Sequence, residues 1–299
     1  MQAGDAAQIT AQQQANWDRH AETYSEVVIS NDSNDLATVQ VISAIKKHKN
    51  LPAAGAKFLD VASSSGRPAV PLAKAFPDAQ VTSTDLSPKS VSLVQKYAEA
   101  QGVTNLTAQA ADAQNLQAFD DNTFSVVTCS YGLFFMPEAT KALREAYRVL
   151  QPGGLFVVTV WGWPDKVQMS EVFMGVSSIL KGNRIGHGDI SPMDLLPWDI
   201  STPRDVQQAL TDAHFADATC TEFQHPLHMT VSDAIKFIVG PGSQLAPMLD
   251  KMKASGRENI QQEAVEAVQE ATSKIGRVED NVIHLDNTSL LLTGMKPLT

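Results

Sequence analysis

The chain has 299 residues, of which 43% are hydrophobic and 19% charged, a composition typical of a globular protein rather than a disordered or fibrous one. This length allows one large α/β domain or two average domains, and we expect one. The formal net charge of −10 and the lack of any run of Lys and Arg disfavour a nucleic-acid partner, because a phosphate backbone is bound through a basic surface.

The cysteines and the N-terminal segment disfavour further classes. Cys129 and Cys220 are far apart in apolar, strand-like surroundings, so we expect two reduced core thiols and neither a zinc site nor a disulfide. The first 14 residues lack the basic flank and apolar run of a secretory signal, and no stretch is as long as a membrane span. We therefore expect a cytoplasmic protein with no metal ion and no membrane partner.

The first elements in chain order lead into an alternating pattern. Residues 1–15, rich in Gln and Ala, are expected to form an arm outside the core, and Trp17 is expected to begin the ordered protein. A helix is predicted over 35–49, and the apolar run 56–62 predicts a buried first strand. After it, the pattern predicts helices over 68–76, 88–101 and 138–150, and strands over 80–84, 106–110, 125–129 and 155–161. Strands separated by such helices indicate βαβ units and a mostly parallel, doubly wound α/β sheet.

The pattern changes after residue 161 and becomes mostly helical. Two later runs, 218–223 and 282–294, are strand-like, and the second suits an antiparallel edge strand that completes a seven-stranded sheet. Helices predicted over 170–180, 203–213, 232–239 and 245–275 would cover the ligand edge of the sheet. We therefore expect one domain made of an N-terminal arm with lid helices (1–50), a cofactor-binding core (51–161) and cover insertions that carry the last two strands (162–299).

The carboxyl ends of the predicted parallel strands carry the candidate binding residues, because ligands of open α/β sheets bind there. A loop of small residues, 60–68, follows the first strand and permits close approach of a ligand. Asp85 ends the second strand, where a carboxylate can accept hydrogen bonds from both ribose hydroxyls. Asp112 follows the third strand, placed to read an adenine amino group, and Ser130 ends the fourth, under the expected reaction centre.

Two ligands compete for such a site, a dinucleotide and S-adenosylmethionine. A pyrophosphate needs free backbone N–H groups at the helix N-terminus, but Pro68 and Pro71 fall in the first turn. Ala62 and Ser64 also replace two glycines of the dinucleotide fingerprint and leave only Gly66. The loop therefore favours S-adenosylmethionine, which carries no phosphate.

Six motifs in this order resemble the class I S-adenosylmethionine-dependent methyltransferases, in the group similar to the ubiquinone and menaquinone biosynthesis enzymes. They are WDRHAETY (17–24), FLDVASSSG (58–66), TDLS (84–87), AADAQNL (110–116), FDDNTFSVV (119–127) and REAYRVLQPGG (144–154). The resemblance implies a Rossmann-like fold and a cofactor site made of Tyr24, Ala62, Ser63, Gly66, Asp85, Leu86, Asp112, Ala113 and Ser130. The sequence departs from the family at Ser64, where glycine is usual.

Simpler roles compete with several of these assignments. Asp85 could cap the following helix, and Asp112 could be a solvated acid. Trp17 and Tyr24 share a helical face, which suits a lid or a core equally. The candidate general bases are His20, His187, His225 and His228, and no single one can be chosen. An apolar substrate pocket is predicted from Phe134, Phe135, Met136, Trp161, Trp163, Phe173, Met174 and Trp198.

The function predicted from these features is methyl transfer to a small-molecule acceptor at carbon, oxygen or nitrogen. The alternatives are a non-catalytic S-adenosylmethionine-binding or scaffolding protein and a nicotinamide oxidoreductase. Nucleobase acceptors are disfavoured because residues 129–135 lack the Asn/Asp-Pro-Pro-aromatic pattern, and arsenic acceptors because only two cysteines are present. The insertion over 162–200 is expected to select the acceptor. The pattern leaves the acceptor's identity and the oligomeric state open.

Overall fold

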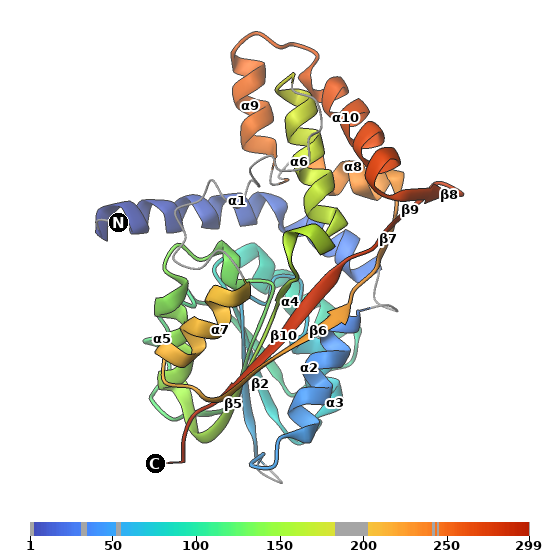
Figure 1. Cartoon of the computed structure of the whole chain (residues 1–299). Coiled ribbons are helices and arrows are strands. Elements are labelled where there is room, and N and C mark those ends of the chain that lie inside the picture. Colours follow the sequence, from blue (N-terminus) through green and yellow to red (C-terminus); the bar gives the residue numbers. More distant parts are fainter. Residues whose placement is uncertain are drawn as a thin grey trace.

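The computed structural model describes residues 3–30, 35–51, 55–182, 203–240, 243 and 245–298 (Figure 1). Its helices are α1 Ala3–Ser30, α2 Leu36–Lys47, α3 Ala69–Ala75, α4 Pro88–Ala100, α5 Ala139–Val149, α6 Gln168–Leu180, α7 Pro203–Asp212, α8 Val231–Val239, α9 Ala246–Ala254 and α10 Ile260–Ile275. Its strands are β1 Lys57–Val61, β2 Gln80–Asp85, β3 Leu106–Ala110, β4 Phe124–Ser130, β5 Leu150–Trp161, β6 Ala216–Gln224, β7 Leu227–Thr230, β8 Arg277–Glu279, β9 Val282–Leu285 and β10 Thr288–Met295.

Seven strands form the main sheet in the order β3-β2-β1-β4-β5-β10-β6. Strands β3, β2, β1, β4 and β5 pair in parallel, whereas β10 pairs antiparallel with both β5 and β6. The predicted doubly wound, mostly parallel sheet of seven strands is confirmed. The antiparallel strand lies one position further in than the sequence suggested, and β6 is outermost. The run 282–294 also divides, because β9 leaves the main sheet and pairs with β7 and β8 in a second, three-stranded sheet.

The two faces of the main sheet are covered by different helices. Leu59 and Val61 of β1 pack in the cluster that contains the buried side chains of α5 and α7. Phe58, directly before Leu59 in sequence, packs with the buried side chains of α2 and α3 on the other face. This alternation follows from the period of two along a strand. Strand β4 is buried at all positions but its last, and its sequence, FSVVTCS, holds only apolar residues and small hydroxyl residues.

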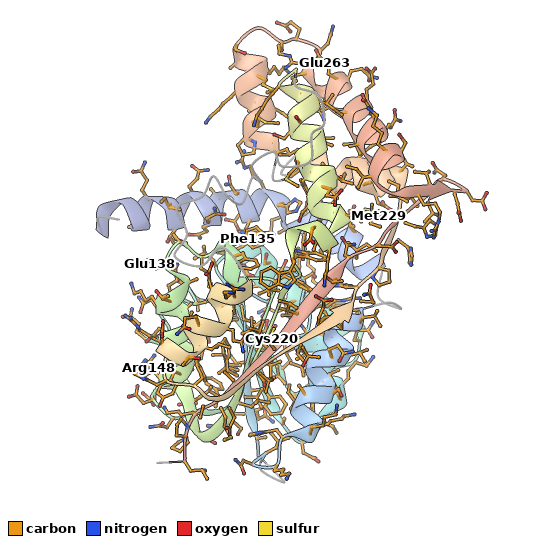
Figure 2. All side chains as sticks on the ribbon, in the orientation of Figure 1. Phe135, Glu138, Arg148, Cys220, Met229 and Glu263 are labelled. Carbon is orange, nitrogen blue, oxygen red and sulfur yellow. The ribbon has the colours of Figure 1, made fainter. Side chains whose placement is uncertain are left out.

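A module of helices and the small sheet stands above the carboxyl ends of the parallel strands (Figure 1). Helices α6, α8, α9 and α10 pack with β7 and β9 around a second apolar core. In Figure 2, Glu263 and Met229 mark this module, and Arg148 lies beside the main sheet below it. The helical insertions therefore lie over the edge of the sheet at which a ligand is expected.

Helix α1 runs between this module and the main sheet (Figure 1). Residues 1–15 were expected to form an arm outside the core, but the described part of this segment is helical from Ala3, and α1 is 28 residues long. The Ala-rich and Gln-rich composition favours a helix. One side of this helix faces a cavity, which Thr10 and Gln13 line. No helix among the described residues is long and apolar enough to cross a membrane.

The cysteines have different environments. Cys129 on β4 is buried, as the sequence predicts. Cys220 on β6 is exposed, so its prediction as a core thiol was wrong. Strand β6 is the outermost strand of the main sheet, and most of its residues are exposed for that reason.

Candidate active site

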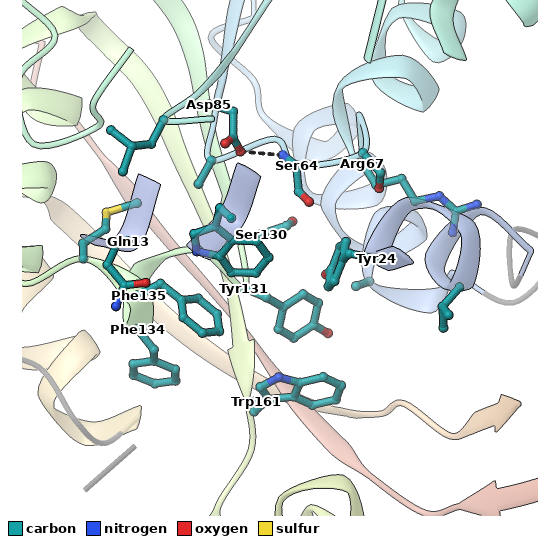
Figure 3. Close-up of a pocket in the computed structure, with 18 of the residues that line it drawn as sticks. Gln13, Tyr24, Ser64, Arg67, Asp85, Ser130, Tyr131, Phe134, Phe135 and Trp161 are labelled. Carbon is teal, nitrogen blue, oxygen red and sulfur yellow. Dashed lines mark hydrogen bonds between the residues drawn. The ribbon is translucent and has the colours of Figure 1, made fainter. Parts of the chain in front are cut away.

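One cavity of about 280 Å³ lies at the carboxyl ends of the parallel strands (Figure 3). Its floor contains Ala62 after β1, Asp85 at the end of β2 and Ser130 at the end of β4. Its cover includes Trp17 and Tyr24 of α1. The cavity therefore joins the strand ends to the helical cover, as expected for an open α/β sheet.

The loop after β1 is held in a tight conformation. The backbone N–H of Ser63 donates to Thr84 O at 2.9 Å, and that of Gly66 donates to Ser63 O at 2.7 Å. Gly66 has φ +93°, and a Cβ atom there would lie 3.1 Å from Val70, so this position requires glycine. Ser64 also has a left-handed conformation, with φ +46°. Ser64 stands where the family that the sequence resembles usually has glycine, and it keeps a left-handed backbone at a cost of about 1 kcal/mol.

Asp85 joins this loop to the start of α4. Its Oδ2 accepts the N–H of Ser64 at 2.8 Å (Figure 3), and its Oδ1 accepts the N–H of Ser87 at 2.9 Å. The pKa of Asp85 is raised to about 6. Burial is the largest cause, the charge of Asp18 also raises the pKa, and the two backbone hydrogen bonds lower it. The N-cap of α4 is Ser87, whose Oγ accepts from Ser90 N, so Asp85 is not the capping residue itself.

Asp112 lies in the turn after β3 and is held in place rather than freely solvated. Its Oδ1 accepts the backbone N–H of Gln114 at 2.9 Å and the side-chain amide of Gln114 at 3.0 Å. The Gln114 Oε1 in turn accepts the N–H of Glu138 at 2.7 Å. Arg148 of α5 donates to Leu116 O at 2.9 Å, which holds the segment just after Gln114. Asp112 therefore presents a fixed carboxylate to the cavity.

The structure brings most of the predicted cofactor residues together. Tyr24, Ala62, Asp85, Leu86, Asp112, Ala113 and Ser130 line the cavity. Ser63 and Gly66 do not line it and instead shape the loop. Ser63 is 1% exposed, and its Oγ donates to Asp60 O at 2.9 Å.

Trp17 and Tyr24 face the cavity, which favours the lid interpretation of the N-terminal motif over the core interpretation. The Trp17 ring meets Phe135 edge-on at 5.1 Å and Tyr24 at 5.7 Å between centroids. Asp18 accepts the Ser87 hydroxyl at 2.5 Å, and this hydrogen bond ties α1 to the start of α4. The lid is thus linked to the loop that Asp85 holds.

An ion pair between Arg67 and Asp35 was not predicted from the sequence. Arg67 Nη1 lies 3.5 Å from Asp35 Oδ2, both residues line the cavity, and their side chains are 8% and 17% exposed. Burial and the charge of Asp35 raise the pKa of the nearby Tyr24 to about 12. The only signal in the sequence was a charged residue, Arg67, inside a loop of small residues.

The four candidate histidines differ in their position relative to the cavity. His187 lies outside the described residues. His20 is buried without lining the cavity, and burial lowers its pKa to about 4. His228 lines the cavity, and its ring lies 4.7 Å from that of His284. His225 also lines the cavity and contacts Tyr131, with 2.6 Å between the His225 Nδ1 and the Tyr131 Oη.

The predicted apolar pocket is present in part. Phe134, Phe135, Met136, Trp161 and Phe173 line the cavity, but Trp163 and Met174 do not, and Trp198 lies outside the described residues. Trp161 stacks on His225, with 5.4 Å between ring centroids and an interplanar angle of 16°. Figure 3 shows Tyr131 between Ser130 and Trp161. The cavity therefore has an acidic end near β2 and β3 and an aromatic end near β5.

Within the described ranges, no three His, Cys, Asp or Glu side chains are grouped to hold a metal ion.

Comparisons with known proteins address this site. Residues 59–158 match the family model of a methyltransferase domain. The chain is 41% identical over 107 residues to an uncharacterised protein of Mycobacterium tuberculosis, a match that covers 36% of this chain and 38% of that protein. It is 36% identical over 110 residues to the demethylmenaquinone methyltransferase of Thermus thermophilus, covering 37% of this chain and 49% of the relative. The chain thus spans less than half the length of these curated relatives.

A solved structure has the same fold over a longer stretch. The YcgJ protein of Bacillus subtilis superposes with a TM-score of 0.53 and 16% identity, and the match covers 86% of this chain and 97% of that one. This likeness supports the Rossmann-like architecture alone. Residues 59–158 thus match a methyltransferase domain, within a chain whose fold is Rossmann-like.

Proposed function

We propose that this protein transfers a methyl group from S-adenosylmethionine to a small, largely apolar molecule bound at the aromatic end of the cavity. One observation carries the proposal: a single cavity joins the strand-end acids Asp85 and Asp112 to the aromatic wall around Trp161. The cofactor supplies an activated methyl group on a sulfonium. The protein's residues then need to align the acceptor with that methyl group and exclude water.

The residues of the cavity suit the parts of this cofactor. Asp112 and Ala113 would lie against the adenine, and the Asp85 carboxylate would accept from the ribose hydroxyls. Arg67 and Asp35 offer a positive and a negative group, which match the carboxylate and the ammonium of the methionine part. The sulfonium would then lie near Ser130, beside Tyr131.

The acceptor is proposed from the cavity and not from the relatives. The family match ends at residue 158, whereas Trp161, Phe173 and His225 of the aromatic end follow it in the chain. The net charge of −10 is consistent with a small-molecule acceptor rather than a nucleic acid. No comparison supports the alternative of a non-catalytic binding protein. A cytoplasmic location stays a prediction.

Calorimetric titration tests the proposal first. S-adenosylhomocysteine should bind with one site, and NAD at the same concentrations should not bind. Incubation with methyl-labelled S-adenosylmethionine and a panel of phenols, amines and thiols should then transfer the label to one class. Binding of NAD alone would favour the oxidoreductase alternative, whereas cofactor binding without transfer to any acceptor of the panel would favour the non-catalytic one.

A further inference from the structure

Three side chains from distant parts of the chain meet at the aromatic end of the cavity. Tyr131 follows β4, His225 lies between β6 and β7, and Ser289 is on β10. The Tyr131 Oη lies 2.6 Å from the His225 Nδ1 and 2.8 Å from the Ser289 Oγ, and the last two atoms are 3.0 Å apart. Tyr131 and His225 line the cavity, whereas Ser289 is fully buried behind them.

The backbone holds these groups in place. The N–H of Tyr131 donates to Thr159 O on β5 at 2.8 Å, and that of His225 donates to Asn287 O, just before β10, also at 2.8 Å. Tyr131 has a left-handed backbone, with φ +55°. This conformation is uncommon for a residue with a large side chain, and such residues cluster at functional sites.

The protonation states suit a proton relay. Burial raises the pKa of Tyr131 well above 10, so the phenol is protonated near neutral pH. Burial lowers the pKa of His225, so the imidazole is neutral. In the neutral tautomer that carries its proton on Nε2, the His225 Nδ1 accepts the phenol O–H, and the Ser289 hydroxyl then donates to the Tyr131 Oη. The other charged or titratable groups that act on this pair are Asp35, which is paired with Arg67, and Tyr24; His228 lines the same cavity.

We propose that Tyr131 and His225 form a relay that removes the proton from the hydroxyl of a planar phenol or enol acceptor. The inference rests on the proposed function and deepens it by naming the acceptor class. Trp161 lies 4.7 Å from the Tyr131 ring and stacks on His225, so the relay is bordered by a flat aromatic wall. A planar acceptor can pack against such a wall with its hydroxyl toward the Tyr131 Oη.

The proton and the electrons balance along this route. The acceptor O–H bond breaks, its proton passes to the Tyr131 Oη, and the phenol proton of Tyr131 passes to the His225 Nδ1. The acceptor oxygen forms a bond with the methyl carbon as the carbon–sulfur bond breaks, and that electron pair stays on sulfur. The imidazolium of His225 then loses its proton to water, and Ser289 acts as a positioning residue for the Tyr131 hydroxyl.

A chromogenic phenol tests the relay without turnover. In the full-length protein saturated with S-adenosylhomocysteine, para-nitrophenol absorbs differently as phenol and as phenolate. The bound probe should ionise in the wild type at a pH about one unit below that in His225→Asn. Asparagine can keep a hydrogen bond to Tyr131 but cannot take the proton. Tyr131→Phe should abolish the shift, and Ser289→Ala should reduce it.

Matched controls use a Tyr and a His outside the cavity. Tyr147 and His214 contact each other near α5 and α7, so Tyr147→Phe and His214→Asn should leave the shift unchanged. Retained affinity for S-adenosylhomocysteine shows that each variant is folded. A wild-type protein that binds no probe, or binds it with the same ionisation as His225→Asn, would overturn the relay and leave methyl transfer as proposed. Lack of S-adenosylhomocysteine binding would instead contradict the proposed function itself.

Discussion

At the scale of single residues, Asp85 both holds the loop after β1 and faces the cavity. Each of its carboxylate oxygens already accepts one backbone N–H, from Ser64 or Ser87, so its position is fixed before a ligand arrives. A carboxylate oxygen has a further lone pair, and the residue lines the cavity. The Asp85 side chain can therefore hold the loop and accept from a ribose at the same time.

The Asp85→Asn substitution removes the charge of this side chain and nearly keeps its shape. Asp85→Asn should weaken S-adenosylhomocysteine binding by about 1.5–3 kcal/mol, because hydrogen bonds to a charged acceptor are lost. Titration calorimetry measures this change. Asp78→Asn, at an exposed acid between α3 and β2, should bind normally. An Asp85→Asn protein with normal affinity and a much lower melting temperature would show that Asp85 only holds the loop.

The raised pKa of Asp85 predicts a pH dependence of binding. Its pKa in the folded protein is about 6, so the carboxylate is largely protonated below that pH and ionised above it. The ionised form accepts the ribose hydroxyls better, so the affinity for S-adenosylhomocysteine should rise as the pH increases from about 5 to about 7. Calorimetry across that range should show the rise in the wild type and a smaller one in Asp85→Asn. An equal rise in both proteins would assign the effect to another group.

At the scale of elements, α1 has two different halves. Between Ala7 and Arg19 no side chain is buried, whereas His20, Ala21, Ser25 and Val27 are. Residues of both halves line the cavity, but only the second half is also packed into the rest of the protein. The sequence could not show this, because the Ala-rich and Gln-rich start lacks the apolar stripe by which a packed helix is predicted.

Truncation distinguishes these halves. Deleting residues 1–14 should leave the melting temperature within a few degrees and raise the dissociation rate of S-adenosylhomocysteine on the order of tenfold, because part of the cover is lost. Deleting residues 1–30 should destabilise the fold itself. Stopped-flow dissociation and thermal unfolding measure the two effects. An unchanged dissociation rate in the shorter deletion would mean that its residues do not retain the ligand.

At the scale of the whole molecule, the two ends of the cavity differ in how far the sequence predicts them. Asp85 and Asp112 follow parallel strands, and the ends of such strands meet by the geometry of the sheet, so their grouping was predictable. Tyr131 and His225 are brought together by the pairing of β10 with β5 and β6. That register depends on the complete sheet, and no local pattern in the sequence specifies it.

Two aromatic residues that the sequence placed in one predicted pocket differ in their position relative to the cavity. Phe173 lines the cavity and Trp163 does not. Phe173→Ala should therefore weaken para-nitrophenol binding by roughly 1–2 kcal/mol through lost apolar contact, with little change in S-adenosylhomocysteine affinity. Trp163→Ala is the matched control and should change neither. Equal losses of both ligands in Phe173→Ala would place the acceptor elsewhere, under Trp17 and Tyr24.

The unequal burial of the two cysteines gives the protein a built-in reporter of unfolding. Cys129 is enclosed on β4, and burial raises the pKa of its thiol to about 12, whereas Cys220 is exposed on β6. A thiol reagent should therefore modify one group per native molecule at once and the second only when the sheet opens. The slow modification rate then measures how often the core around Cys129 is exposed, and ligands that stabilise the closed sheet would lower it without any engineered label.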